Sequence, residues 1–283
     1  MRISISNIAW DKKDDEKVYR ILQENNIRGL DVAPARIFEK PFDISLNQGQ
    51  VFINTLKTFN LTPVGMQSLL FGTNGLALFE DESIRRQTIE HLKKMMDYAQ
   101  KIGITRLVFG SPKNRLVKGL SEKEIEQLCY EIFNELGDYA VAKGLYFCIE
   151  PNPINYGADF VTNTMDGIRL VKKINNPGFR LHLDLGTMIM NNENIEEVVK
   201  AGIDVVEHVH LSHPNLEQVI GYEEIHKRLY QALEYNNYRG TVAIEMKNSG
   251  ESNNIRKVEQ TIIFIKSIYG GEKSETRLAN TRI

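Results

Sequence analysis

The sequence predicts an α/β protein that folds as a single (β/α)8 barrel, in which eight parallel strands form a cylinder inside a ring of helices. Apolar, strand-like runs alternate strictly with helix-like segments, and eight such cycles fit along the chain. The length of 283 residues is close to the roughly 250 residues of one barrel. No glycine-rich fingerprint follows the first strand, where an open, doubly wound sheet usually carries one.

The predicted strands are short apolar runs that stop at proline, glycine or a polar residue. The most informative is LYFCIEPNP, because Pro151 cannot donate a ladder hydrogen bond and therefore ends the strand directly after Glu150. The eight predicted strands lie at 2–7, 28–33, 62–70, 105–110, 145–150, 179–184, 205–212 and 241–247.

Each predicted strand is followed by a segment with a helical apolar period or a helix-start signal. Val18, Ile21 and Leu22 carry the period of the first helix. Ser121 and Glu124 form the capping-box pattern of a later one. After the first, helices are predicted at 45–59, 81–101, 121–143, 162–174, 194–201, 222–235 and 254–269. Residues 1–269 would then form one barrel, and 270–283 a polar tail, either a disordered end or an arm reaching a neighbouring subunit.

Composition and charge favour a soluble protein with a small-molecule partner. A net charge of −2 gives no footprint for a strongly nucleic-acid-binding surface, and no run approaches the ~18 apolar residues of a membrane span. The N-terminal MRISISNIAW lacks the basic region and apolar core of a signal peptide. Cys129 and Cys148 lack the spacing of a zinc or redox motif, so we expect reduced core residues and a cytoplasmic protein.

Four ligand-type side chains stand where successive predicted strands end. They are Glu150, Asp184, His210 and Glu245, separated by 34, 26 and 35 residues. These intervals are close to the roughly 30 residues of one strand-helix-strand unit. Because side chains alternate along a strand and parallel strands end at one mouth, all four are expected to face the same space.

The same alternation turns three more side chains inward. Lys247 follows Glu245 on the same face, and His182 and His208 precede the ligand-type residues on strands six and seven. An inward histidine in a barrel layer is most often hydrogen-bonded in the core or supports a ligand, and this interpretation is preferred for His182 and His208.

Three carboxylates and one imidazole suit a divalent metal ion. Mn²⁺ is the expected ion, with Mg²⁺, Co²⁺ or Zn²⁺ as alternatives by ligand softness. The alternative is a set of unrelated polar residues that loop amides and water satisfy. A metal site is favoured for four such residues in succession, because without a cation their charges would force at least one carboxylate to take up a proton.

The motifs EPN, HLDLG, HVH and IEMK, in this order, resemble those of the xylose-isomerase-like TIM barrel superfamily. The resemblance spans essentially the whole chain, and is strongest to sugar phosphate isomerase/epimerase and ketose 3-epimerase members. It implies that Glu150, Asp184, His210 and Glu245 bind the metal and that Glu150 and Glu245 form the acid/base pair. Related barrels commonly form dimers or tetramers, so it also implies a homodimer or homotetramer without determining the oligomeric state.

The implied activity is isomerisation or epimerisation of a sugar, sugar phosphate or related hydroxy-carbonyl compound through an enediolate. A metal that chelates the carbonyl and a neighbouring hydroxyl oxygen acidifies the adjacent C–H, and one glutamate removes the proton. Three alternatives stay open. They are an inosose-type dehydratase, a non-catalytic metal- or sugar-binding barrel, and an AP-endonuclease-like phosphodiesterase, whose additional histidines after strands three and four this sequence lacks.

Candidate substrate contacts include the positions where the chain departs from the ketose epimerases. Thr187 stands where those enzymes carry a substrate-binding histidine, and His213 lies where they place an arginine. Lys247 is the candidate replacement for that cation. Ser111 and Arg115 belong to a loop suited to an anionic substituent, although a solvated polar loop is the alternative.

Two other groups are predicted to contact substrate. Asn152, Tyr156 and Asp159 lie in the loop after the fifth strand. Gln67 and Trp10 follow the third and first strands and could form a pocket wall, although an aromatic residue at a strand end often only covers the core.

Overall fold

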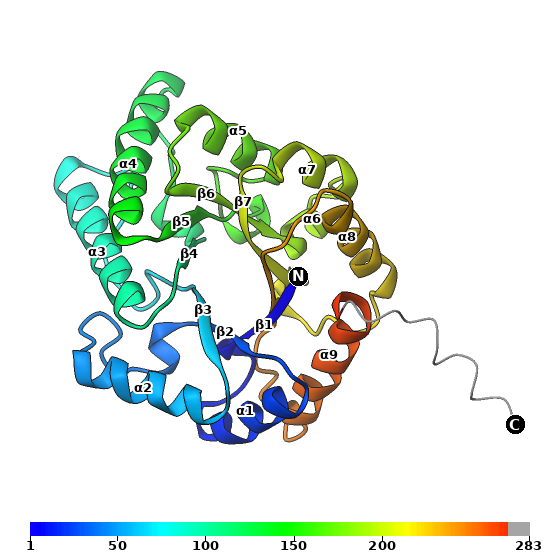
Figure 1. Cartoon of the computed structure of the whole chain (residues 1–283). Helices are drawn as coiled ribbons and strands as arrows, with labels where there is room; N and C mark the ends of the chain where they lie inside the picture. The colour runs from blue at the N-terminus through cyan, green and yellow to red at the C-terminus, as the bar shows by residue number, and fades with distance from the viewer. Residues whose placement is uncertain (271–283) are drawn as a thin grey trace, which may run out of the picture.

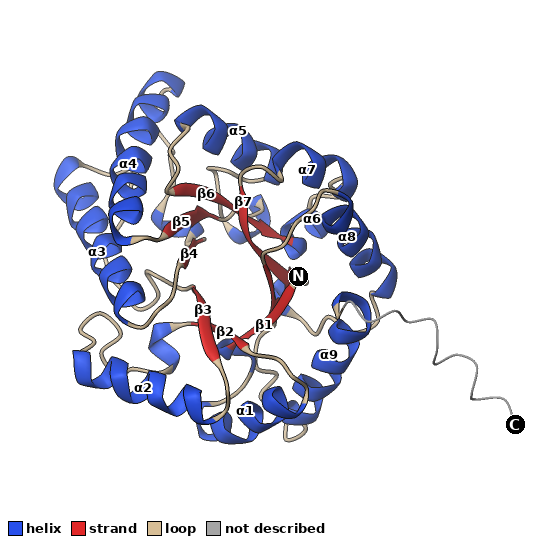
Figure 2. Ribbon diagram, viewed as in Figure 1, coloured by secondary structure: helices blue, strands red, loops and turns tan. Residues whose placement is uncertain are grey.

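The computed structural model describes residues 1–270 and shows a closed barrel of eight parallel strands in chain order, surrounded by helices (Figures 1 and 2). This confirms the predicted single (β/α)8 barrel. The strands are β1 (Arg2–Ser6), β2 (Gly29–Val32), β3 (Thr62–Met66), β4 (Arg106–Phe109), β5 (Tyr146–Ile149), β6 (Phe179–Asp184), β7 (Val206–Ser212) and β8 (Thr241–Glu245).

In the described part of the chain, the α-helices are α1 (Asp15–Glu24), α2 (Leu46–Thr58), α3 (Glu82–Lys101), α4 (Glu122–Lys143), α5 (Thr164–Ile174), α6 (Leu185–Met190), α7 (Ile195–Gly202), α8 (Glu223–Tyr235) and α9 (Asn254–Tyr269). Polar side chains cap the starts of α2 to α7, whereas α1, α8 and α9 have no side-chain cap. The Ser121–Glu124 capping box forms as predicted, and Gly144 ends the same helix in the left-handed region at φ 70°.

Three local features differ from the sequence-based expectation. Helix α6 was not predicted, because it follows β6 without a loop and is capped by the side chain of the last strand residue, Asp184. Strand β3 ends at Met66, four residues early. Strand β8 ends at Glu245, whose ladder partner Ser212 is the last residue of β7. The alternation therefore does not extend to Lys247, and its predicted inward orientation is wrong.

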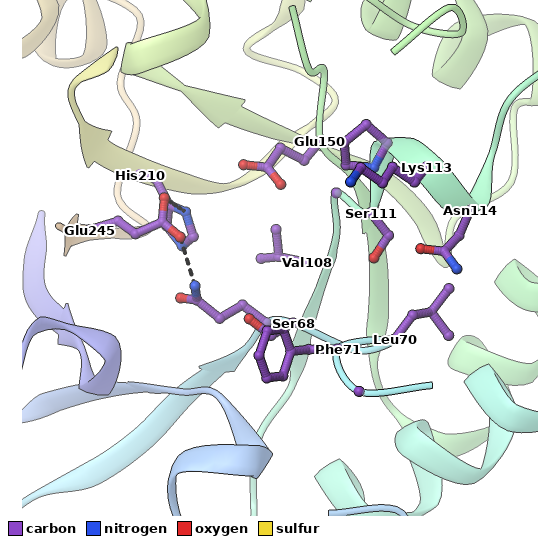
Figure 3. A pocket seen from close by; sticks show the side chains of 14 residues that line it. Ser68, Leu70, Phe71, Val108, Ser111, Lys113, Asn114, Glu150, His210 and Glu245 are labelled. Carbon is purple, nitrogen blue, oxygen red and sulfur yellow. Dashed lines mark hydrogen bonds and ion pairs between the residues drawn. The ribbon is translucent and has the colours of Figure 1, made fainter. Parts of the chain in front are cut away.

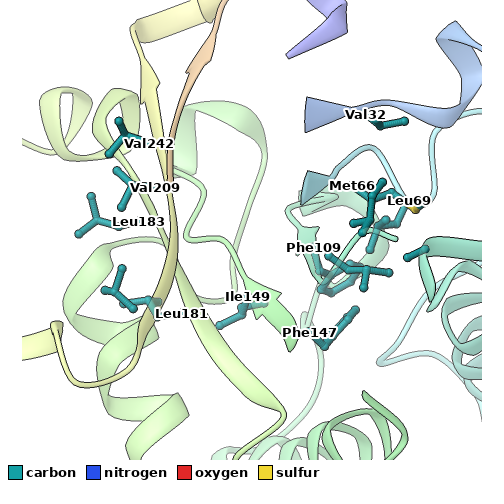
Figure 4. Packing of buried hydrophobic residues seen from close by; sticks show 14 of the residues in the cluster. Val32, Met66, Leu69, Phe109, Phe147, Ile149, Leu181, Leu183, Val209 and Val242 are labelled. Carbon is teal, nitrogen blue, oxygen red and sulfur yellow. The ribbon is translucent and has the colours of Figure 1, made fainter. Parts of the chain in front are cut away.

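The apolar core fills the space between the strands and the helices (Figure 4). The packing of β6 against the helices is close at Leu181. A Cβ atom added at Gly167 of α5 or at Gly202 of α7 would contact its side chain. Phe147 is fully buried between Phe109 and Phe179, with ring centroids 5.3 and 6.5 Å away. Burying one such side chain contributes about 1.5–3 kcal/mol, so this layer stabilises the cylinder that holds the strand ends in place.

The strand register places polar residues at matching heights inside the barrel. His182 of β6 pairs with His208 of β7, and Asp184 pairs with His210 one step closer to the mouth. Cys129 and Cys148 are buried and unpaired, as predicted. No helix within residues 1–270 is long and apolar enough to cross a membrane. The predicted polar tail, apart from Gly270, lies outside the described residues.

Candidate active site

A cavity of about 430 Å³ opens where the strands end (Figure 3). Its wall combines residues of the β3–α3 loop between 67 and 72 and of the β4–α4 loop between 110 and 114 with Glu150, His210 and Glu245. The mouth at the carboxyl ends of the strands is where barrels of this architecture place their active sites.

The four predicted metal-binding residues come from four consecutive strands. Glu150, His210 and Glu245 line the cavity, and Asp184 lies close to Glu150 and His210. Glu150 directly follows β5, Asp184 ends β6, His210 lies in β7 and Glu245 ends β8. One ligand atom each of Glu150, Asp184 and His210 lies within 4.8 Å of the others, in a group that also includes His182. Oε2 of Glu245 is 3.2 Å from Nδ1 of His210.

Glu150 reaches the cavity because Gly110 leaves room for its carboxylate. A Cβ atom added at Gly110 would overlap Oε2 of Glu150, so a larger residue at the end of β4 would displace the acid. The fully buried Arg115 donates from Nη2 to the backbone oxygen of Glu150 at 2.6 Å and to Oδ1 of Asn152 at 2.8 Å. These contacts hold the start of the β5–α5 loop.

The three carboxylates are electrostatically unequal. Although Glu150 opens onto the cavity, burial and repulsion from Asp184 and Glu245 raise its pKa to about 8. Burial and the charge of Glu245 also raise the pKa of Asp184. Burial acts in the same direction on Glu245, but His210 and the amide of Gln67 hold the pKa of Glu245 below its ordinary value. In the absence of a cation, Glu150 therefore keeps its proton to a higher pH than Glu245 does.

The arrangement of donor atoms fits a divalent cation. Nδ1 of His210 makes no aligned hydrogen bond to Glu245 or to any other described residue, although their atoms lie 3.2 Å apart. A nitrogen and a carboxylate oxygen at this distance can both coordinate one ion. Burial lowers the pKa of His210, but Glu245 and Asp31 outweigh it and hold this pKa well above its ordinary value. In the metal-free site, a proton on His210 therefore offsets negative charge that a bound cation would otherwise neutralise.

Behind His210 lies a buried acid that the strand-end pattern did not select. Oδ2 of Asp31, in β2, is 2.6 Å from Nε2 of His208 and 3.4 Å from Nε2 of His210. Its Oδ1 accepts a hydrogen bond from Ser4 at 3.0 Å. Because Asp31 engages Nε2, Nδ1 is the nitrogen of His210 left for the cavity. The only sequence signal for Asp31 was its position between two apolar residues of a strand. His208 contacts Asp31 and does not line the cavity.

A sequence profile of the xylose isomerase-like TIM barrel family matches residues 20–268. This chain belongs to that family. No curated protein matches the chain.

Solved structures share the fold at low sequence identity. D-psicose 3-epimerase from Clostridium cellulolyticum H10 has a TM-score of 0.77 and 16% identity, over 95% of this chain and 99% of that one. The IOLI protein with a binding zinc atom has a TM-score of 0.70 and 15% identity, over 95% and 99%. AP endonuclease, family 2 from Brucella melitensis has a TM-score of 0.72 and 22% identity, over 94% and 99%. The activity of this xylose isomerase-like barrel must therefore be inferred from its site.

Gln67 and Ser111 are the predicted substrate contacts that line the cavity of this xylose isomerase-like barrel. Nε2 of Gln67 donates to Oε1 of Glu245 at 2.6 Å, and the amide oxygen has no partner within residues 1–270. Ser111 adopts the left-handed region at φ 43°. Phe71, which is 69% exposed, and Lys113 complete this side of the wall.

Thr187 is buried outside the cavity wall, and its predicted substrate contact stays a prediction. Its amide donates to Oδ1 of Asp184 at 2.6 Å, and its hydroxyl donates to the backbone oxygen of Pro151 at 2.9 Å. The other carboxylate oxygen of Asp184 accepts a hydrogen bond from Ser212. Because α6 starts directly after β6, Asp184 caps this helix, and the backbone amide of Thr187 orients the carboxylate of this predicted metal ligand.

Three more residues predicted to contact substrate lie outside the cavity wall, two of them buried and one exposed. Trp10 is 1% exposed and donates from Nε1 to Asp15 at 2.7 Å. His213 is 1% exposed, with Nε2 lying 3.2 Å from Nε2 of His226. Lys247 is exposed beyond the end of β8 and borders a separate surface hollow.

The loop residues predicted to contact substrate instead join neighbouring loops. Arg115 and Asn152 are buried against each other, and Asp159 accepts from the backbone of the β4–α4 loop at 2.9 Å. None of the three lines the cavity, and their substrate contacts stay predictions. Tyr156 accepts from the backbone of the β7–α8 loop at 2.8 Å. Burial, together with the acids of the site, raises the pKa of Tyr156, so its position next to them keeps it a candidate.

Proposed function

We propose that this protein is a metal-dependent sugar isomerase or epimerase, which moves a proton at a carbon next to a carbonyl group through an enediolate. The observation that carries the proposal is the pair Glu150 and Glu245. They enter one cavity from β5 and β8 (Figure 3), and their pKa values are displaced in opposite directions. Carboxylic acids separated in this way suit the roles of acid and base on one substrate. The likeness to D-psicose 3-epimerase supports the same reaction class.

Glu150, Asp184, His210 and Glu245 would hold the divalent cation. When bound, such a cation polarises the substrate carbonyl and stabilises the charge that develops on its oxygen. We propose Mn²⁺, because three carboxylates and one imidazole combine the oxygen ligands that hard cations prefer with one softer nitrogen. Metal titration distinguishes Mn²⁺ from Mg²⁺, Co²⁺ and Zn²⁺.

Glu245 is the proposed base. It is ionised, and Oε2, next to Nδ1 of His210, would bind the cation. Oε1, which the Gln67 amide orients at 2.6 Å, would use its second lone pair to take a proton from the substrate carbon. The C–H electrons then form the carbon–carbon double bond of the enediolate. Glu150, bound to the cation through one oxygen and protonated on the other, would deliver that proton to the opposite face of that carbon, which inverts the centre. If Glu245 instead returns the proton on its own face to the neighbouring carbon, the product is an aldose-ketose isomer.

The proposed substrate is a small carbohydrate. A cavity of about 430 Å³ is within the usual range of small-molecule sites, about 300–1,000 Å³. The free amide oxygen of Gln67 and the hydroxyl of Ser111 offer hydrogen bonds to sugar hydroxyl groups, and Phe71 offers an apolar face. Lys113 supplies a cation at the mouth that suits a phosphate or carboxylate substituent.

Exchange of substrate hydrogen with solvent deuterium tests this function. The protein, titrated with Mn²⁺, is incubated in D₂O with a panel of ketoses and sugar phosphates, and each recovered sugar is analysed by NMR. We expect deuterium at one carbon together with an epimer or isomer, and loss of both on chelation or in a folded Glu245→Gln variant. A wild-type rate that survives either change contradicts the proposal. A conjugated, absorbing product would identify a dehydratase instead.

A further inference from the structure

His182 is a buried group to which the proposed chemistry gives no role. It lies in β6, two residues before Asp184, and is 0% exposed. Neither Nδ1 nor Nε2 has a hydrogen-bond partner among the residues that the structure describes. A neutral imidazole offers one N–H donor and one lone pair, and burying both without a partner is unfavourable. The position of His182 therefore requires a partner that protein atoms do not supply.

Its ladder partner His208 provides a direct comparison. The two histidines pair across β6 and β7 and are equally buried. His208 is engaged by Asp31, whose Oδ2 lies 2.6 Å from its Nε2. His182 instead turns toward the ligand cluster, where its ring centroid is 4.1 Å from that of His210. His208 thus holds Asp31, which contacts His210, whereas His182 lies next to His210 itself.

We propose that His182 is a ligand of the divalent cation, so that two imidazoles coordinate it. This inference rests on the metal centre of the proposed function and extends its ligand set. A ligand atom of His182 lies within 4.8 Å of those of Glu150, Asp184 and His210. Two atoms bound to one ion at about 2.1 Å are at most about 4.2 Å apart, so a small contraction of the cluster is sufficient.

The second imidazole changes which metals the site prefers. Imidazole nitrogen suits Zn²⁺ and Co²⁺, whereas Mg²⁺ prefers carboxylate, carbonyl and water oxygens. With His182 the donor set becomes three carboxylates and two imidazoles. The barrel should therefore discriminate against Mg²⁺ more strongly than the four strand-end residues alone would.

X-ray absorption spectroscopy of the full-length protein loaded with Zn²⁺ or Co²⁺ tests this inference without any activity measurement. Outer-shell scattering should report two imidazoles in the wild type and one in His182→Gln. Competition titrations should show an affinity for Zn²⁺ and Co²⁺ lowered about 10–100-fold by His182→Gln, with the affinity for Mg²⁺ nearly unchanged. The matched control is His226→Gln, which removes a buried imidazole next to His213 and Tyr269. It should leave the imidazole number and the metal preference as they are.

The outcomes separate this inference from the function on which it rests. A wild-type spectrum with one imidazole overturns the role of His182 and leaves the four-residue metal centre standing. An equal loss of affinity for every metal, with the imidazole number unchanged, also overturns it, because it indicates a structural role. A protein that binds no divalent cation overturns both proposals. The wild-type spectrum decides the question even if His182→Gln does not fold.

Discussion

Replacing Asp31 by Asn tests whether this buried acid determines which nitrogen of His210 faces the cavity. The change keeps the size of the side chain, and the amide oxygen can still accept the hydrogen bond from Ser4. It replaces Oδ2, the acceptor next to Nε2 of His208 and His210, by an NH₂ group that donates. Nε2 of His210 then has to accept, so its proton moves to Nδ1. A protonated Nδ1, 3.2 Å from Glu245, has no lone pair for a cation.

The size of the effect follows from this loss of orientation. Removing the partner that orients a metal-binding histidine typically lowers metal affinity about 10–100-fold, which corresponds to about 1.4–2.7 kcal/mol. Asp31 is fully buried and sits 3.4 Å from Nε2 of His210, so solvent cannot replace it and we expect the upper part of this range. Ser4→Ala, which removes the contact to the other oxygen but keeps the charge, should have a smaller effect.

The assay is competition with a fluorescent chelator for Zn²⁺ and Mn²⁺, at a pH above the raised pKa of Glu150 so that proton competition is small. Nitrogen-15 NMR of the Zn²⁺ form should show His210 metal-bound at Nδ1 and protonated at Nε2 in the wild type. This pattern should be absent from Asp31→Asn at the same metal concentration. A folded variant with unchanged affinity and the wild-type pattern would refute the reasoning.

Three further predictions concern the acid, its neighbour and the metal. Because the pKa of Glu150 is raised from 4.5 to about 8, the folded metal-free protein keeps a proton that the unfolded chain has lost, so stability should fall as pH rises between these values. Glu150→Gln should reduce this slope in denaturation curves of the chelated protein, with the raised pKa values of Asp184 and His210 accounting for the remainder, and an unchanged slope would contradict the assignment. Gly110→Ala should lower deuterium exchange by up to about 100-fold by displacing Glu150, and wild-type exchange would show that the gap is not needed. Mn²⁺ at about 100 times its Kd should stabilise the fold by about 2.7 kcal/mol, visible as a chelator-reversible rise in Tm.

The sequence by itself determined the barrel and the positions of the four ligand-type residues at its strand ends, because both depend on local periodicity. Strand alternation and the stop at Pro151 place Glu150 at the mouth, and the same period places Asp184, His210 and Glu245 there. Parallel strands of a closed barrel end at one rim, so residues at their ends must converge. Where a strand stops depends on its neighbour, and for that reason the inward orientation predicted for Lys247 was wrong.

Only the tertiary structure decided what surrounds these ligands. Past the strand ends the alternation no longer applies, and side chains such as Thr187 and His213 turn toward partners on other segments. The contact of Asp31 with His208 spans 177 residues, and no local pattern encodes it. The opposite pKa displacements of Glu150 and Glu245 likewise arise from charges brought close by folding, because electrostatic interactions depend on distance in space rather than along the chain.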